Sequence, residues 1–238
     1  MIEKEFGIIS MQSAFFLGAL DVKNKLEFAQ DLISSTAGIL NGDPLLLPIP
    51  GKLEDYPAEL PFIILKSKDD NFSCNIAKGR IDFLYKGKPE TRKNISEFWP
   101  EYQKTVSDIT KFIRDVINER IWRLGFVVVV SREFNESINA LLMKNYLKPG
   151  IFEKPYEIQL NILNKLTYEQ VDLNRWIKLR PVRETQDPTK DYNFLIEVDI
   201  NTISEKSYAF EGEQIERFFI FSHSHIVSEI PKYILVED

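Results

Sequence analysis

His223 and His225 are the only histidines in this sequence of 238 residues, so any histidine-dependent chemistry must use one of them. They lie two positions apart in a segment with helical periodicity, so their side chains point to different faces of the predicted helix. His225 could act as a general base toward Ser222 or Ser224, although no Gly-x-Ser-x-Gly elbow surrounds these serines. We favour the simpler interpretation, in which the helix histidine bonds to a neighbour or to water.

Glu197 and Asp199 alternate with Val198 on a predicted strand, so both carboxylates face the same side of a sheet. Such a pair could hold Mg²⁺ for phosphodiester hydrolysis, together with Lys178 or Glu157 from neighbouring strands. Metal-dependent nucleases of this type would carry a lysine two residues after the second acid, and Asn201 stands there instead. The alternative is a solvated sheet face with cross-strand salt bridges.

Two stretches carry a local excess of positive charge. The basic residues of 78–93 and of 175–183 are Lys78, Arg80, Lys86, Lys88, Arg92, Lys93, Arg175, Lys178, Arg180 and Arg183. Phe83, Tyr85 and Trp176 are interleaved with them, and basic and aromatic side chains on a sheet can bind an anionic partner such as single-stranded nucleic acid. The candidate binding residues are Arg80, Lys86, Arg175, Lys178 and Arg180. Lysines and arginines also occur on exposed strands simply because they discourage edge pairing.

The sequence lacks the common motifs for cofactors and metals. It has only 10 glycines and contains neither a phosphate-binding loop nor a dinucleotide-binding glycine pattern. One cysteine and two histidines cannot build a usual zinc site. We therefore expect no cofactor and no metal site, and we lean toward a protein that is not an enzyme.

Composition is that of a globular protein, with 44% apolar and 28% charged residues. The net charge of −6 argues against wholesale nucleic-acid binding but permits a local basic surface. The lone Cys74 cannot form an intramolecular disulfide, which indicates a reducing compartment. No signal peptide is evident and no apolar run is long enough to span a bilayer, so we expect a cytoplasmic protein without a membrane partner.

The segment from Pro100 to Arg132 dominates the element pattern. Apolar residues recur at three- and four-residue steps up to Trp122 and predict a long amphipathic helix. Gly125 is then expected to end this helix. The following Phe126 and the valines 127–130 predict a strand that is buried on both faces and therefore central.

Each half of the chain reads as strand, helix, three strands, helix. The predicted strands lie at about 5–19, 62–67, 72–77 and 80–86 in the first half, and at 126–130, 156–163, 167–180 and 192–200 in the second. The predicted helices include 135–146 and a last one at about 211–229. We predict an α+β fold of two β-α-β-β-β-α halves, with a mainly antiparallel sheet and helices packed on one face. The chain is expected to form one compact unit, 1–238, with possible structural repeats 1–123 and 124–238 related by a pseudo-twofold.

Three short motifs carry a family resemblance. They are Phe98-Trp99-Pro100-Glu101-Tyr102, Arg123-Leu124-Gly125-Phe126 and Ser224-His225-Ile226-Val227. In their order along the chain they resemble a sporadically distributed family of uncharacterised bacterial proteins of similar length. The resemblance implies no activity, substrate or catalytic residue, and it supports a single co-folded unit.

The leading hypothesis is a non-enzymatic binding or interaction module that uses a sheet surface or an inter-repeat groove. Its partner would be a macromolecule, either a protein or single-stranded nucleic acid, and self-association is open. The alternatives are a metal-dependent hydrolase that uses Glu197 and Asp199, and a carrier of a small ligand.

Overall fold

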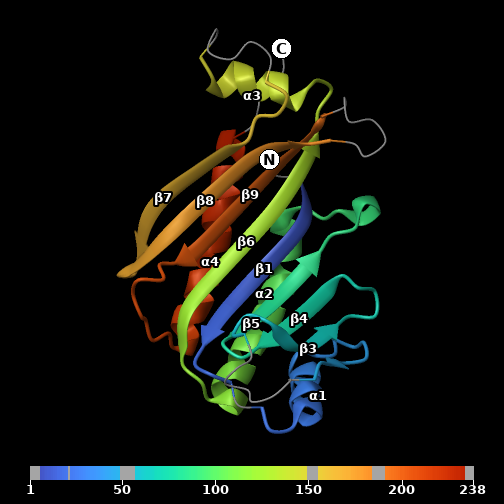
Figure 1. The fold of residues 1–238 in the computed structure, drawn as a ribbon, viewed down its shortest axis with the longest axis vertical. Helices are drawn as coiled ribbons and strands as arrows, with labels where there is room; N and C mark the ends of the chain where they lie inside the picture. The colour runs from blue at the N-terminus through green and yellow to red at the C-terminus, as the bar shows by residue number, and fades with distance from the viewer. Residues whose placement is uncertain (1–5, 21, 49–56, 149–154, 184–190, 234–238) are drawn as a thin grey trace.

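A nine-stranded antiparallel sheet forms the centre of the computed structural model, which describes residues 6–20, 22–48, 57–148, 155–183 and 191–233 (Figure 1). The strands are β1 Gly7–Leu17, β2 Leu45–Leu46, β3 Pro61–Lys66, β4 Phe72–Ala77, β5 Arg80–Lys86, β6 Ile121–Glu133, β7 Leu160–Tyr168, β8 Val171–Val182 and β9 Asn193–Thr202. The helices are α1 Lys25–Ser35, α2 Ile95–Phe112, α3 Ile138–Tyr146 and α4 Gly212–Glu229. The predicted α+β class with a large antiparallel sheet is confirmed.

The sheet order is β2-β3-β4-β5-β1-β6-β9-β8-β7. The first strands of the two predicted halves, β1 and β6, therefore lie side by side at the centre. Moving outward, β5 and β9 come next, followed by β4 and β8. This order agrees with the predicted element sequence of each half, but it does not establish that one half is a copy of the other, so duplication stays a prediction.

Helices α2 and α4 lie behind the sheet as it is viewed in Figure 1, on the same face. The hydroxyl of Tyr102 in α2 donates to the Oγ of Ser13 on β1 at 3.1 Å. The ring of Phe219 in α4 packs 5.4 Å from that of Phe15 on β1 and 6.0 Å from that of Phe126 on β6. We call this the covered face of the sheet, and the opposite side the open face.

The valine strand is central, as predicted, because β6 lies between β1 and β9. Its start was predicted wrongly, since β6 begins at Ile121 and Gly125 lies within it, opposite Ala14. The preceding helix α2 ends at Phe112 and is followed by a π-helical turn, Ile113–Ile117. The apolar spacing that suggested a helix up to Trp122 is outweighed here by strand pairing with β1.

Asn118 ends the helical segment with a left-handed backbone, at a φ of 53°. Asparagine tolerates this conformation better than most residues, so a glycine is not needed at this turn. At the other end of α2, the side chain of Asn94 accepts a hydrogen bond from the backbone N–H of Glu97 and so caps the helix.

The strands predicted at 72–77 and 80–86 are confirmed as β4 and β5. The next hairpin was placed too early, because β7 runs from Leu160 to Tyr168. The turn that joins it to β8 is Glu169–Gln170, and both residues have positive φ angles, of 46° and 67°. The pattern offered no glycine or proline to mark this turn, so the predicted strand 167–180 ran through it.

None of the described helices is both long enough and apolar enough to cross a membrane.

Candidate functional site

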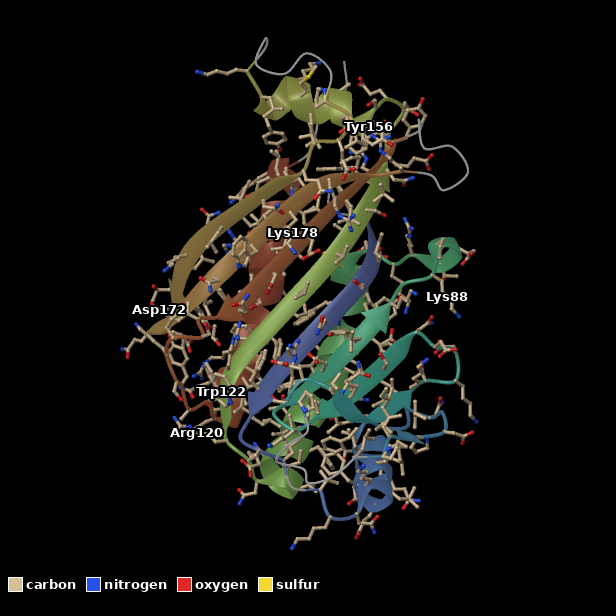
Figure 2. All side chains as sticks on the ribbon, in the orientation of Figure 1. Lys88, Arg120, Trp122, Tyr156, Asp172 and Lys178 are labelled. Carbon is tan, nitrogen blue, oxygen red and sulfur yellow. The ribbon has the colours of Figure 1, made fainter. Side chains whose placement is uncertain are left out.

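Strand register assigns each sheet side chain to the covered face or to the open face, because directly opposite residues point to the same side. Phe16 on β1 lies opposite Arg80 on β5 and Arg123 on β6. All three belong to the open face, since the neighbouring Phe15 packs against α4. Figure 2 shows that side chains, and no layer of helices, lie over this face, with Lys178 and Trp122 labelled on it.

Phe16 forms the centre of a cationic and aromatic cluster on the open face. The guanidinium carbons of Arg80 and Arg123 each lie 4.7 Å from the centroid of its ring. Since β1 lies between β5 and β6, the two arginines approach the ring from opposite sides. The ring of Trp122 lies 5.9 Å away, and its Nε1 donates to the carbonyl of Leu17 at 2.8 Å. Arg80, Phe16 and Arg123, together with Trp122, are called the arginine pocket below.

A cavity of about 350 Å³ opens at the arginine pocket. Its lining residues are Phe16, Leu17, Gly18, Ala19, Ala58, Glu59, Lys78, Gly79, Arg80, Trp122 and Arg123. Its volume lies at the lower end of the range for small-ligand pockets, which is about 300–1,000 Å³. The cavity therefore combines a flat apolar surface with cations at its rim, a combination that suits a planar group carrying negative charge.

The two arginines of the pocket differ in their partners. Arg80 Nε donates to the carboxylate of Asp82 at 2.8 Å, and Asp82 also accepts from Gln12 Nε2 at 2.9 Å. Arg123 donates instead to two neutral acceptors, the carbonyl of Thr202 at 3.1 Å and the Oδ1 of Asn201 at 3.4 Å. Arg123 thus makes these hydrogen bonds to neutral groups, while its positive charge also acts on the nearby carboxylate of Asp199.

Further across the open face, Lys178 on β8 forms an ion pair with Glu197 on β9, with the charged atoms 2.6 Å apart. Trp176 lies beside them with 36% of its surface exposed, opposite Asp199. Burial raises the pKa of Asp199, and the neighbouring Glu197 adds to this, against a hydrogen bond from Asn201 at 2.9 Å. Lys178 and Asn201 therefore already engage the two carboxylates.

Glu197 and Asp199 share one face of the sheet, as the alternation predicted. Within the ranges that the structure describes, no three His, Cys, Asp or Glu side chains gather closely enough to hold a metal ion. Glu157, the other predicted ligand, lies before the start of β7. Its carboxylate accepts a hydrogen bond from the side-chain amide of Gln159. The predicted hydrolase site gains no further ligand from the described residues.

The predicted basic residues do not form one cluster. Lys86 joins Arg80 on β5, while Lys178 and Arg180 lie on β8, and these four occupy the open face. Strands β5 and β8 are separated by β1, β6 and β9, so they lie about 19 Å apart at the usual strand spacing. The register places Lys178 level with Lys86, six residues along β5 from Arg80, so Lys178 lies about 28 Å from Arg80. The open face is basic at two places rather than continuously.

Arg175 lies on the covered face, beneath α4, away from the other candidates. Its Nη1 lies 3.0 Å from the carboxylate of Glu229 and 2.7 Å from the Nε2 of His225. The carboxylate of Glu229 also accepts from Lys232 Nζ at 2.5 Å and from the Tyr233 hydroxyl at 3.1 Å. Glu229 is only 3% exposed, so Arg175 and Glu229 form a buried ion pair that fastens α4 to β8.

His225 is part of that buried cluster. Burial lowers its pKa first, and the adjacent positive charge of Arg175 lowers it further, so the neutral ring accepts from the guanidinium. Its neighbour His223 stacks on Trp99 of α2, with ring centroids 4.2 Å apart and an angle of 8° between planes. These contacts support the structural interpretation of both histidines that we favoured.

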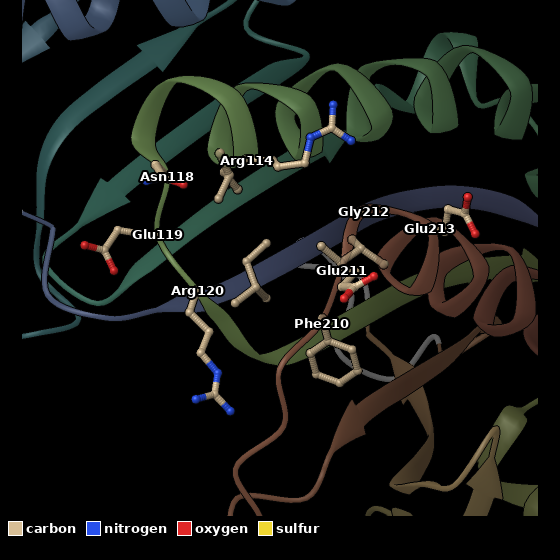
Figure 3. Close-up of a pocket in the computed structure, with 11 residues that line it drawn as sticks. Arg114, Asn118, Glu119, Arg120, Phe210, Glu211, Gly212 and Glu213 are labelled. Carbon is tan, nitrogen blue, oxygen red and sulfur yellow. The ribbon is translucent and has the colours of Figure 1, made fainter.

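A larger cavity of about 640 Å³ lies between the end of α2 and the start of α4 (Figure 3). Charges of both signs line it, since Arg114 and Arg120 contribute to the lining together with Glu119, Glu211 and Glu213. Arg114 also donates to the neighbouring Asp115 at 2.6 Å. The mixed charges select no class of ligand, so we do not assign a function to this cavity.

Sequence reasoning missed Phe16 and Arg123. Arg123 was placed on a helix, and Phe16 belonged to a run that was noted only as apolar. The available signal was the alternation Arg123, Gly125, Val127, Val129, which extends the valine strand backward with a period of two and separates its faces.

No protein-family model matches the sequence, and no curated protein matches it. Among solved structures, the chain is similar to a rolling circle replication initiator protein from Geobacillus stearothermophilus. The TM-score is 0.38 and the identity 12%, over 95% of this chain and 82% of that chain. A likeness of this size carries no functional argument, so any assignment rests on the side chains of this chain.

Proposed function

We propose that the open face of the sheet binds single-stranded nucleic acid. The observation that carries this proposal is the arginine pocket, where Phe16 lies between two guanidinium groups at 4.7 Å beside a cavity of about 350 Å³. Because the two guanidinium groups cover the ring of Phe16, an unpaired base would stack on the neighbouring ring of Trp122 or on a guanidinium plane. The arginine charges would attract the flanking phosphates.

The second basic place on the face supports a strand rather than a small anion. Lys178, Arg180 and the exposed ring of Trp176 repeat the combination of cation and aromatic surface, with Lys178 about 28 Å from Arg80 by strand spacing and register. A flexible single strand of a few nucleotides spans that distance, whereas one small ligand does not. The acidic groups between the two places, Glu197 and Asp199, disfavour a uniformly charged partner that lies flat, such as a duplex.

The test measures fluorescence anisotropy with labelled single-stranded and duplex oligonucleotides of equal length at low salt. We expect the single strand to bind and the double variant Arg80→Ala, Arg123→Ala to bind it at least tenfold more weakly. Trp122→Ala keeps both charges and should cost about 1–3 kcal/mol of binding free energy, because it removes an aromatic ring on which a base would stack.

The matched control is Arg114→Ala with Arg217→Ala, which removes the same charge from exposed positions on the helical side. This control should bind like the wild type. The proposal is wrong if the wild type binds no single strand at low salt, or if both double variants lose the same affinity. If the wild type binds no single strand but binds a protein partner, and if that binding is lost in the Arg80→Ala, Arg123→Ala variant, the interaction-module alternative is supported.

A further inference from the structure

The two outer edges of the sheet are built differently. At one edge, β2 has only two residues and β3 begins with Pro61, next to a register shift. Short strands, prolines and irregular register all discourage pairing with another chain. At the other edge, β7 pairs with β8 through all nine of its residues, and in the part of the chain that the structure describes no strand lies on its outer side.

Strand β7 thus presents an uninterrupted row of backbone N–H and C=O groups about 30 Å long. It contains no proline and no glycine, and Lys165 is its single charged residue. Leu163 on its open-face side is 42% exposed and lies opposite Trp176, which is 36% exposed. A long, regular edge with a single charged residue is a template for a further strand.

We propose that β7 pairs antiparallel with β7 of a second copy of this chain, around a twofold axis through Asn164. Asn164 is the middle residue of the strand, so this register uses its full length. It puts Ile162 opposite Leu166 on the covered-face side and Leu163 opposite Lys165 on the open-face side, since opposite residues share a face.

The strand is complementary to itself in this register. Asn161 meets Thr167, Leu160 meets Tyr168, and the amide of Asn164 meets its symmetry mate. Lys165 never faces the lysine of the other copy, and its aliphatic stem can lie along the exposed Leu163. A twofold axis through Lys165 would instead place two lysines directly against each other, which is unfavourable.

The twofold axis is perpendicular to the sheet, so both helical layers lie on the same side and the two open faces join. The interface consists of one strand pair and its flanking side chains, and it therefore belongs to the small, reversible class. We expect dissociation in the micromolar range, so that monomer and dimer are both observed as concentration changes.

The experiment compares two substitutions at one exposed position, Leu163→Lys and Leu163→Glu. In the proposed register the lysine variant places like charges opposite each other twice per dimer, and the glutamate variant places opposite charges there twice. Analytical ultracentrifugation over the micromolar range should show a concentration-dependent dimer for the wild type. The dimer dissociation constant should rise roughly tenfold for Leu163→Lys and should not rise for Leu163→Glu.

Circular dichroism checks that both variants are folded, which the exposure of Leu163 favours. A wild type that stays monomeric throughout the range overturns the proposal. A dimer that both variants weaken equally, or that neither affects, also overturns it, because its interface is then not this register.

Discussion

Arg80 and Arg175 both belong to the basic stretches of the sequence, yet they lie on opposite faces of the sheet. Arg80 reaches over the ring of Phe16 on the open face, where its side chain is 27% exposed and paired with Asp82. Arg175 is 12% exposed and held beneath α4 by Glu229 and His225. Arg80 thus lies on the side of the sheet that no helix covers, and Arg175 fastens a helix.

The difference comes from the parity of a single position along a strand. Successive side chains of a strand point to opposite faces, so a shift of one residue moves an arginine from the solvent to the core. Trp176, one residue after Arg175, lies on the open face for the same reason. A basic stretch in a sequence therefore contains residues of two kinds, and only the register separates them.

Breaking the ion pair beneath α4 should have the largest effect. Glu229→Ala leaves the buried charge of Arg175 without its carboxylate, and we expect it to lower the free energy of unfolding by about 3–5 kcal/mol. Asp82→Ala removes the corresponding partner of Arg80 on the open face and should cost at most about 1 kcal/mol. Urea denaturation of the two variants gives both values. Equal losses would contradict the contrast between the faces.

A smaller effect should appear as a pH dependence of the covered face. Burial lowers the pKa of His223 from 6.5 to about 4, and its Nε2 has no hydrogen-bond partner among the described residues. The unfolded chain then binds a proton more readily, so the free energy of unfolding should fall as the pH drops from about 6.5 to about 4. Because the ring is partly exposed, we expect roughly 2 kcal/mol.

His223→Phe preserves a ring on Trp99 and removes this titration. Its stability should therefore fall less than that of the wild type over this pH interval, as measured by urea denaturation at several pH values. Parallel curves for the two proteins would show that His223 does not titrate differently in the folded state.

The smallest effect should come from Lys178, whose charge is already compensated by Glu197 at 2.6 Å. Lys178→Ala should weaken single-strand binding only about twofold and change the free energy of unfolding by less than about 1 kcal/mol. Arg123→Ala should weaken binding more and should also flatten its salt dependence, because a phosphate contact by Arg123 would release a counterion from the nucleic acid. Anisotropy titrations at several salt concentrations compare the two variants. A larger loss of affinity in Lys178→Ala than in Arg123→Ala would show that the strand binds mainly at Lys178 and Arg180 rather than at the arginine pocket.

The sequence predicted the elements better than it predicted the faces. Strands β4 and β5, the capped start of α2 and the central position of the valine strand all follow from local patterns that the structure keeps. The start of β6 does not follow from a local pattern, because pairing with β1 decides it. The turn at Glu169–Gln170 does not either, because two residues with positive φ angles form it without a glycine.

The arginine pocket was only partly predictable for a related reason. Arg80 was singled out from its own basic stretch, but Phe16 and Arg123 come from strands far away in the chain. They meet Arg80 only because β1 lies between β5 and β6, and one strand pattern does not state which strands will be neighbours. The periodicity of a sequence indicates which residues of one strand share a face. Which residues of different strands form a site depends on the order of the strands in the sheet.

The central pair of the sheet also has a consequence for how the chain folds. Strands β1 and β6 are joined across a long separation, as where Trp122 donates to Leu17, 105 positions away. Such non-local pairing must wait for loop closure, which slows folding. During synthesis, the first half emerges while the edge of β1 that will meet β6 is still unpaired. The nascent chain therefore passes through a stage with an exposed strand edge, and a chaperone that shields this edge should raise the yield of folded protein.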